Sequence, residues 1–277
     1  MLTFSRKYYQ LLIIGVFLLL VLFFFATPVY ASDIRVTIDD EAVIFDGQGP
    51  IPINPRPPMV ALTFDDGPSP NTSRILDVLE RYDARATFFV LGYRSARHRN
   101  IVERAANIGS EIASHTWTHD NMAHLSAARI RESIESTSAL IESITGVPSP
   151  HFFRPPFGST NDTVRYVSAQ MGYTITNWTL DTWDWRNRNP DIIYEAIMNE
   201  VEDGSVILLH DIHLTTAQAM EFVIPSLIAQ GFELVTLSEL LMFFYGELVP
   251  GKIYGRVYDE DLEARESLYS MGVYNDI

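Results

Sequence analysis

The strongest constraint on the fold is a repeated alternation of short β-type runs with helical patterns, which begins at Met59. Runs rich in Val, Ile, Phe and Thr favour strands, and apolar residues at three- and four-residue spacing favour amphipathic helices. Strands that alternate with helices pair in parallel, because each crossover helix returns the chain to the same end of the sheet. Seven such runs predict an α/β fold with a barrel-sized parallel sheet. The seven runs are MVALTF, ATFFVL, EIASH, HFFR, YTITNWTL, SVILL and FELVTL.

The sequence indicates the two ends of one intervening helix and the apolar face of another. Ser126 is a suitable N-cap for the segment AARIRESIESTSALIESI, and Gly146 is suited to end that helix. A second helix is predicted over 217–229, where apolar residues recur on one face.

The composition excludes several classes of function. The 277-residue chain has a formal net charge of -15, which disfavours nucleic-acid binding because phosphate contacts need clustered Lys and Arg. It contains no cysteine, so disulfides, thiolate metal ligands and a Cys nucleophile are excluded. Any metal must therefore be held by His, Asp or Glu. With 47% hydrophobic residues, the chain can bury the core of a globular enzyme.

The N-terminus has the pattern of a membrane-targeting segment. Arg6 and Lys7 precede an uncharged apolar run from Leu11 to Ala26, and TPVYAS follows with small residues. We expect residues 1–31 to be a signal peptide cleaved after Ala31 or a retained membrane anchor. In either case the rest of the chain is exported, and the protein is extracytoplasmic, secreted or anchored through this segment alone.

The remainder divides into three predicted parts. Residues 32–57 hold two short alternating runs, IRVTI and AVIF, followed by proline-rich sequence, which indicates a hairpin-like stalk. The alternating region forms a domain at 58–244, and 245–277 is a C-terminal extension that packs on it.

Polar residues that could bind a metal or take part in catalysis follow the predicted strands. Because the carboxyl ends of parallel strands meet at one end of a barrel, we expect these residues to converge there. They are Asp65 and Asp66, His115, Arg154, Asp181 and Asp184, and His210 with Asp211.

Asp65 and Asp66 are the first candidates for a metal site. Two adjacent buried carboxylates repel unless a cation or shared proton relieves them. On an extended chain they point to opposite sides, so one could bind a metal while the other reaches a water; the alternative is a plain Asp-Asp-Gly-Pro turn. In SHTWTH, His115 and His119 are four residues apart, which on a helical turn places both imidazoles within reach of one ion.

The later strands supply further candidates. Arg154, in the proline-stiffened RPPFG, can hold a carboxylate in a bidentate way, and Phe157 or its backbone N–H can face a ligand. The indoles of DTWDW suit either stacking on a sugar or core packing. His210, in LLHD, has an ordinary pKa near 6.5 that suits proton transfer.

TFDDGP, SHTWTH, RPPFG, DTWDW and LLHD, in this order, resemble the five motifs of the polysaccharide deacetylase family, carbohydrate esterase family 4. The resemblance runs from about residue 58 to 244 and implies a distorted (β/α) barrel. It also implies a divalent ion, zinc first and cobalt or another ion next, held by Asp66, His115 and His119.

The resemblance further assigns roles to individual residues. Asp65 is implied as the general base with Arg154 holding it, and His210 as the general acid tuned by Asp184, with Arg85 behind. For the substrate, the resemblance implies a pocket and groove formed by Leu209, Phe157 and Trp183. His98, His124, His151 and His213 receive no role.

The activity implied is hydrolysis of N-acetyl groups on an extracellular glycan, with peptidoglycan N-acetylglucosamine first and chitin oligomers next. Two alternatives stay open. The same water attack could cleave acetyl esters on xylan-type glycans, or the domain could be a catalytically silent glycan-binding module.

Overall fold

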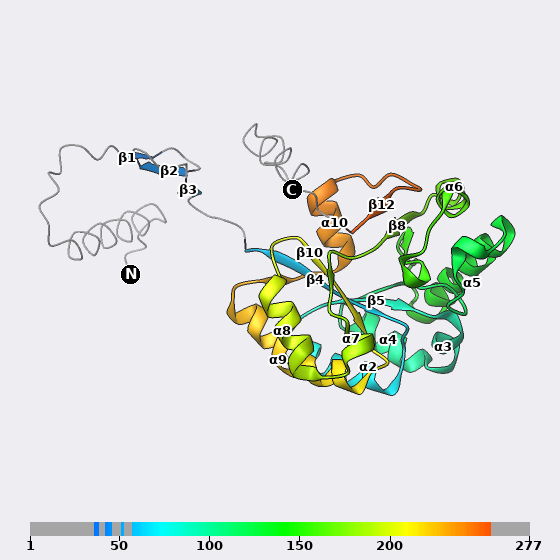
Figure 1. Cartoon of the computed structure of the whole chain (residues 1–277), viewed down its shortest axis with the longest axis horizontal. Helices are drawn as coiled ribbons and strands as arrows, with labels where there is room; N and C mark the ends of the chain where they lie inside the picture. The colour runs from blue at the N-terminus through cyan, green and yellow to red at the C-terminus, as the bar shows by residue number, and fades with distance from the viewer. Residues whose placement is uncertain (1–35, 39–41, 46–50, 53–56, 256–277) are drawn as a thin grey trace, which may run out of the picture. The chain divides into compact units, whose positions relative to one another are not determined.

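The computed structural model describes residues 36–38, 42–45, 51–52 and 57–255 (Figure 1). The chain divides into two units, Met1–Arg56 and Pro57–Ile277. In the first, β1 (Val36–Ile38), β2 (Ala42–Phe45) and β3 (Ile51–Pro52) form an antiparallel sheet in that order. The hairpin predicted from IRVTI and AVIF is therefore present. The predicted leader lies outside the described residues, and within the described ones no helix combines the length and apolar character needed to span a bilayer.

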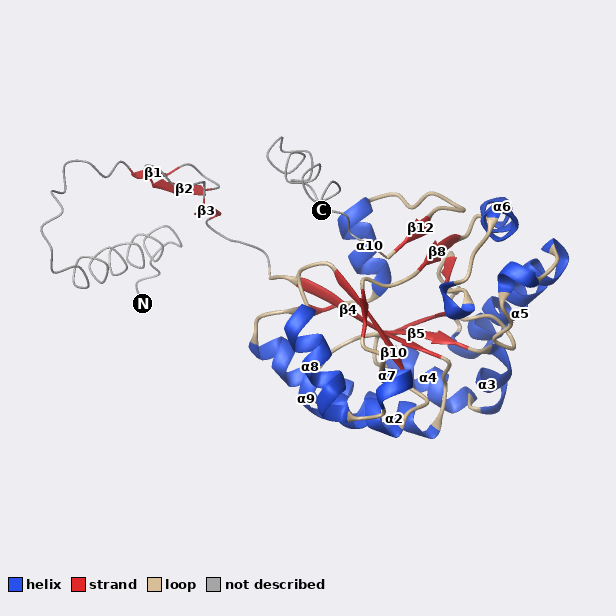
Figure 2. Ribbon diagram, viewed as in Figure 1, coloured by secondary structure: helices blue, strands red, loops and turns tan. Residues whose placement is uncertain are grey.

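The second unit is built on a parallel sheet, which confirms the predicted α/β class (Figure 2). Its order is β12-β8-β7-β6-β5-β4-β10-β9, and β11 pairs with the start of β4. Every strand pair recorded in this sheet is parallel. The strands are β4 (Met59–Asp65), β5 (Thr87–Val90), β6 (Glu111–Ser114), β7 (Phe152–Phe153), β8 (Thr174–Thr176), β9 (Leu180–Asp181), β10 (Ser205–His210), β11 (Glu233–Leu234) and β12 (Ile253–Tyr254).

The sheet curls because β8 and β9 lie toward its two ends although they are neighbours in sequence. Residues 177–179 connect them, and so short a segment spans at most about 14 Å between Thr176 and Leu180. The prediction of one strand over YTITNWTL is therefore wrong: the chain leaves the β7 side after Thr176 and joins β10 at Leu180. This crossing brings the two sides of the sheet together as a distorted barrel.

Helices follow the strands, and most of them cover the outer face, whereas the last helix packs on the other side of the sheet. They are α2 (Pro70–Arg81), α3 (Gly92–Arg97), α4 (Arg99–Asn107), α5 (Ala127–Thr145), α6 (Asp162–Met171), α7 (Asp184–Asn187), α8 (Pro190–Glu200), α9 (Leu214–Ala229) and α10 (Leu237–Tyr245), with short 3₁₀ turns at Met122–His124 and Pro156–Gly158. Ser126 caps α5 by accepting a hydrogen bond from Arg129 N, and Gly146 ends it at φ 74°, both as predicted. The helix predicted over 217–229 is confirmed as part of α9.

The two faces of β4 have different surroundings. Val60, Leu62 and Phe64 pack into the core cluster formed with α2 and α9. Ala61 belongs to a second cluster with α10, which lies on the other side of the sheet in Figure 2. Since side chains alternate along a strand, Asp65 shares the face of Ala61 and Thr63. The site is thereby placed at the carboxyl ends of the strands, on the inner face.

The sheet also extends beyond the predicted domain limit at residue 244. The strand β12 adds to the edge at β8, where Tyr254 pairs with Thr176. The first part of the predicted C-terminal extension is thus an integral part of the sheet, and residues 256–277 lie outside the described ones.

Candidate active site

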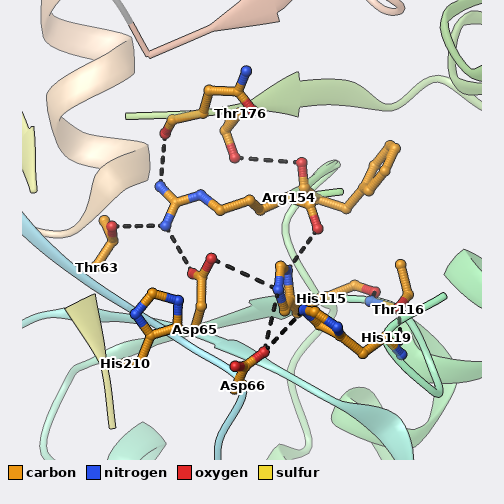
Figure 3. Close-up of polar contacts among 12 residues, drawn as sticks. Thr63, Asp65, Asp66, His115, Thr116, His119, Arg154, Thr176 and His210 are labelled. Carbon is orange, nitrogen blue, oxygen red and sulfur yellow. Dashed lines mark hydrogen bonds and ion pairs between the residues drawn. The ribbon is translucent and has the colours of Figure 1, made fainter. Parts of the chain in front are cut away.

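The strand ends bring the predicted polar residues together. Asp65 ends β4 and His210 ends β10, and these two residues are register partners in the parallel pair. Register partners in adjacent strands point to the same face, so the carboxylate and the imidazole are neighbours (Figure 3). His115 follows β6, Arg154 follows β7 and Asp184 follows β9. The predicted convergence at the carboxyl end of the sheet is confirmed.

Asp65 is held from behind by Arg154, as predicted, although through one nitrogen and not through the bidentate contact that the sequence suggested. The Arg154 side chain is fully buried, and its Nη1 donates to Asp65 Oδ1 at 2.8 Å and to Thr63 Oγ1 at 2.8 Å. Its Nη2 donates to the carbonyl of Asn177 at 2.7 Å. The guanidinium also lies over the ring of Phe89, with 4.1 Å between Cζ and the ring centroid. These contacts fix the plane of the guanidinium and leave Asp65 Oδ2 on the side of His115 (Figure 3).

Asp66, His115 and His119 form a group that could hold a metal ion. Asp66 Oδ1 lies 3.2 Å from His119 Nε2 and 3.5 Å from His115 Nε2. One ligand atom from each residue lies within 4.8 Å of the others. Tetrahedral zinc bonds of roughly 2.0–2.2 Å place ligand atoms about 3.3–3.6 Å apart, which matches these separations. Asp66 Oδ1 is buried and accepts no hydrogen bond from the described residues, so the three side chains fit a cation.

The local backbone that presents these ligands differs from the predicted one. Asp66 has φ 74°, so the chain turns sharply after β4 rather than remaining extended. His115 and His119 are not on a helical turn: they are joined by a loop in which Thr116 and His119 have φ 72° and 63°. Left-handed conformations cost non-glycine residues energy and occur where the surrounding fold imposes them. Here they aim three ligands at one point.

Hydrogen bonding selects the nitrogen of His115 that faces the ion site. His115 Nδ1 lies 2.8 Å from the carbonyl oxygen of Arg154, which can only accept, so Nδ1 carries the proton and donates. His115 Nε2 therefore presents its lone pair toward Asp66. Burial lowers the pKa of His115 in spite of the two nearby carboxylates, which favours the neutral imidazole that a metal requires.

His210 is oriented by Asp184, also as predicted. Asp184 Oδ1 lies 2.7 Å from His210 Nδ1, while its Oδ2 accepts from the His210 backbone N–H and from Thr216 Oγ1, each at 2.7 Å. Asp184 is fully buried at the start of α7. Sequence reasoning missed Thr216, because it belongs to none of the five motifs and only the packing of α9 brings it to Asp184.

The pair has shifted proton affinities. Burial opposes the charged form of His210, but its hydrogen bond to Asp184 and the charges of Asp184, Asp65 and Asp66 outweigh burial and raise the pKa to about 9. Burial also opposes the charge of Asp184, whose pKa is nevertheless lowered by its bonds to His210 and Thr216. An imidazolium held by a carboxylate at Nδ1 has Nε2 available to donate a proton.

The predicted groove residues have two different placements. Phe157 is 68% exposed and Trp183 is 47% exposed, so both side chains are available to a ligand. The Phe157 ring meets the His119 ring edge-on, with centroids 4.7 Å apart. Leu209, in contrast, is fully buried in the core cluster with Leu62 and the outer helices. The prediction that Leu209 lines the acetyl pocket is wrong, because strand alternation points it away from the face of His210 and places Leu208 on that face.

Asp211 supports the turn that carries Asp66. Its Oδ2 accepts from Thr72 Oγ1 at 2.5 Å, and its carbonyl accepts from Ser69 Oγ at 2.8 Å. Burial, with the nearby charge of Asp66, raises the pKa of Asp211 to about 7. A Cβ atom at Gly67 would lie 2.1 Å from Asp211 Oδ2, so only glycine fits against this carboxylate.

Arg85 does not lie behind Asp184, so this expectation is wrong. Its Nη1 instead pairs with Glu239 Oε1 on α10 at 2.5 Å. Asp181 has no hydrogen bond to the acid pair, and its Oδ1 accepts from the backbone N–H of Trp183 at 2.9 Å. Burial raises the pKa of Asp181.

Within the described residues, no histidine other than His115 and His119 joins a candidate metal group.

The comparisons with known proteins agree with this geometry. A family model described as polysaccharide deacetylase matches residues 53–176. The peptidoglycan-N-acetylmuramic acid deacetylase PdaC of Bacillus subtilis (strain 168) is 40% identical over 189 residues, covering 68% of this chain and 40% of the relative. The peptidoglycan-N-acetylglucosamine deacetylase PgdA of Listeria monocytogenes is 38% identical over 197 residues, covering 70% of this chain and 41% of the relative. The chain thus spans about two fifths of the length of these two curated relatives.

Solved structures extend the match to the fold. The structure of PdaC from Bacillus subtilis has a TM-score of 0.66 and 35% identity, covering 80% of this chain and all of that one. A family 4 acetyl xylan esterase from Clostridium thermocellum, in complex with a cobalt ion, has a TM-score of 0.66 and 36% identity, covering 72% of this chain and 98% of that one. With the five motifs converging at one end of a curled parallel sheet, the chain belongs to the polysaccharide deacetylase family.

Proposed function

We propose that the protein hydrolyses N-acetyl groups on a cell-wall glycan, with peptidoglycan N-acetylglucosamine as the first candidate and chitin oligomers as the next. The observation that carries the proposal is the pairing of Asp65 with His210 beside the Asp66, His115 and His119 group. One strand end thus offers a carboxylate base and its neighbour offers a protonated imidazole. The named activities of the two bacterial relatives support a peptidoglycan substrate.

The proposed cofactor is a divalent cation, zinc first and cobalt next, held by Asp66, His115 and His119. When bound there, such an ion supplies Lewis-acid polarisation of the acetyl carbonyl and acidifies water. The three ligands would leave room for water and substrate, as catalytic sites require.

The chain's own groups supply the proton transfers. Asp65 Oδ2 would accept a proton from the attacking water, because Arg154 holds Oδ1. The water oxygen bonds to the acetyl carbon, and the Phe157 backbone N–H would donate to the resulting oxyanion. His210 Nε2 would protonate the departing nitrogen as the C–N bond breaks, which yields acetate and a free amine. Trp183 and Phe157 would form the walls that position the sugar.

Ester hydrolysis is a second candidate, supported by the named activity of the acetyl xylan esterase that shares the fold. An alcohol leaves more readily than an amine, so cleavage of an ester would depend less on His210. A silent binding module would need no base, acid or metal ligands, whereas the chain carries candidates for each at one site.

The test is acetate release by the full-length protein from N-acetylated peptidoglycan, chitin oligomers and acetylated xylan. Each substrate is assayed with zinc, with a chelator and with an Asp65→Asn variant as control. Zinc-dependent release from an N-acetyl glycan supports the proposal and identifies its substrate. Release from xylan alone would select the esterase, and silence on all three with zinc bound would select the binding module.

We also propose that the protein acts outside the cytoplasm, where such glycans lie, through export by residues 1–31. Cell fractionation with an antibody to the second unit tests the compartment. N-terminal sequencing of the isolated protein distinguishes cleavage after Ala31 from a retained anchor.

A further inference from the structure

The helix α7 places a cation beside the acid side of the site. It begins at Asp184, which binds His210, and ends at Asn187, with Arg188 as its C-cap. Arg188 lies just beyond the helix, close enough to His213, the residue before α9, for its charge to act on that imidazole. Arg186 lies within the helix and is also exposed. Figure 2 shows α7 beside β10 at this end of the sheet.

The backbone around α7 is constrained at both ends. Trp183 precedes the helix at φ 54° and Arg188 follows it at φ 47°. Seven non-glycine residues among the described ones have positive φ, and five of them lie in the loops of the candidate site: Asp66, Thr116, His119, Phe157 and Trp183. Strained positions of this kind concentrate at functional sites. Arg188 shares this backbone conformation with Trp183 at the other end of the same short helix.

Arg188 is exposed and has no ion pair with any carboxylate that the structure describes. Several other arginines in this acidic chain do have carboxylate partners, among them Arg81, Arg104, Arg129 and Arg165. An uncompensated guanidinium at the rim of a site favours an anionic ligand, and its planar fork matches a carboxylate.

His213 connects Arg188 to the catalytic pair. Its ring centroid lies 6.0 Å from that of His210, and its side chain does not cap α9 although it occupies the N-cap position. Burial, followed by the positive charge of Arg188, lowers the pKa of His213 to about 4. The lowered pKa favours the neutral imidazole, which can donate one hydrogen bond, and its ring lies beside the residue proposed to protonate the leaving group.

We propose that Arg188 and His213 form a subsite for a carboxylate carried by the glycan, next to the sugar that loses its acetyl group. Trp183 and Trp185 lie on the same chain segment as Arg188, and both are partly exposed, with ring centroids 5.5 Å apart. Their rings would contact the faces of the sugars. The proposal rests on the deacetylase function proposed above and narrows its substrate to an anionic glycan. Peptidoglycan carries such carboxylates on its lactyl ethers and peptide stems, whereas chitin and unsubstituted xylan carry none.

The experiment compares matched ligands on the full-length, zinc-loaded protein. Four oligomers of equal length are used: a chitin oligomer, a peptide-free peptidoglycan oligomer, the same oligomer with its lactyl carboxylates amidated, and one bearing peptide stems on amidated lactyl groups. Dissociation constants are measured by calorimetry and kcat/KM by acetate release. The variants are Arg188→Gln, His213→Gln and, as the matched control, Arg186→Gln, which removes a second exposed arginine of the same segment that is not among the charges shifting the pKa of His213.

The wild type is expected to bind a carboxylate-bearing oligomer about tenfold more tightly than its amidated form, a typical effect of one charge-assisted contact. Arg188→Gln should abolish this preference, His213→Gln should reduce it, and Arg186→Gln should retain it. Chitin affinity should stay within about twofold in every variant. Tighter binding of the oligomer with free lactyl carboxylates identifies the lactyl group as the source of the carboxylate. Tighter binding of the oligomer with peptide stems identifies the stem.

Two results would overturn the subsite: equal affinity of the wild type for carboxylate and amide forms, or equal losses on chitin and peptidoglycan in Arg188→Gln. The binding data separate this failure from failure of the proposed function. Acetate release without a carboxylate preference removes the subsite and keeps the deacetylase. An Arg188-dependent preference without acetate release from any oligomer keeps the subsite and removes the deacetylase.

Discussion

The two halves of the candidate site are stabilised in different ways. On the acid side, Asp184 satisfies His210 and Thr216 with hydrogen bonds of 2.7 Å, and both carboxylate oxygens have partners. On the metal side, Asp66 Oδ1 has no hydrogen-bond partner among the described residues and faces two imidazole nitrogens. The acid side is complete in its own hydrogen bonds, whereas the metal side gathers ligand atoms whose charge and lone pairs a cation would satisfy.

This difference teaches how adjacent carboxylates can coexist in a buried loop. Asp65 is compensated by Arg154 within the fold, and Asp66 is presented to an ion by a left-handed turn. Arg154 thus offsets one of the two neighbouring charges, and a cation held at the proposed metal site would offset the other. Substitutions on the two halves should accordingly separate ion binding from proton transfer.

The largest expected effect is on turnover. Asp65→Asn should lower kcat by about 10²–10⁴, the range for loss of a general base, while zinc remains bound. His119→Ala should lose both zinc and activity, because it removes one of three ligands. Acetate release and metal content of the purified variants measure the two effects. Equal loss of zinc from both variants would contradict the separation of base and ligand.

The next effect is on stability. Arg154→Met leaves Asp65 buried without its cation and should lower the free energy of unfolding by about 3–5 kcal/mol. The matched control is Arg129→Met, which breaks an exposed pair with Glu132 and should change it by less than about 1 kcal/mol. Urea unfolding of the two variants measures the difference. Similar values for both would show that the buried pair adds nothing to stability.

A smaller effect concerns pH. Asp184→Asn removes the main group that holds the pKa of His210 at about 9, so the alkaline limb of kcat/KM should move to lower pH. The raised pKa also means that the pair's contribution to stability is complete below about pH 6.5 and is lost as the pH rises through about 9. Unfolding and activity profiles between these values test both statements. The exposed Asp162→Asn serves as control, and an unchanged alkaline limb in Asp184→Asn would exclude His210 as the titrating acid.

The smallest expected effect comes from Thr216→Val. It removes one hydrogen bond to Asp184 Oδ2 and leaves the His210 backbone N–H in place, so a cost of about 1 kcal/mol is expected. The alkaline limb of kcat/KM should shift slightly in the direction of the Asp184 variant. Thr137→Val, which loses only a bond to the Ser133 carbonyl within α5, should leave this limb unchanged. An identical pH profile in both threonine variants would assign Thr216 a purely structural role.

Much of this site could be predicted because its residues follow strands. Once strands alternate with helices, their carboxyl ends must meet, and the pairing of Asp65 with Arg154 and of His210 with Asp184 follows from five short motifs. The local backbone could not be predicted in the same way. The positive φ values of Asp66 and His119 have no signal in the sequence, and the close approach of Gly67 to Asp211 beside Asp66 joins segments distant in sequence.

The errors have a similar origin. A continuous β-type run over 173–180 gave no sign that the chain changes edges within it, because propensity does not report which neighbour a strand pairs with. The prediction that Leu209 lines the acetyl pocket was wrong by one position, because neighbouring residues of a strand point to opposite faces. Thr216 and the pairing of Arg85 with Glu239 depend on helix packing alone.

The short crossing between β8 and β9 has a consequence for the whole enzyme. Asn177 donates its backbone N–H to the carbonyl of Tyr254 at 2.6 Å, and its own carbonyl accepts from Arg154 at 2.7 Å. One peptide segment therefore joins the last strand of the sheet to the arginine that restrains Asp65. Local opening at this seam would release the guanidinium from one of its anchors, so the amide exchange rate at Asn177 would report how firmly Arg154 is held beside Asp65.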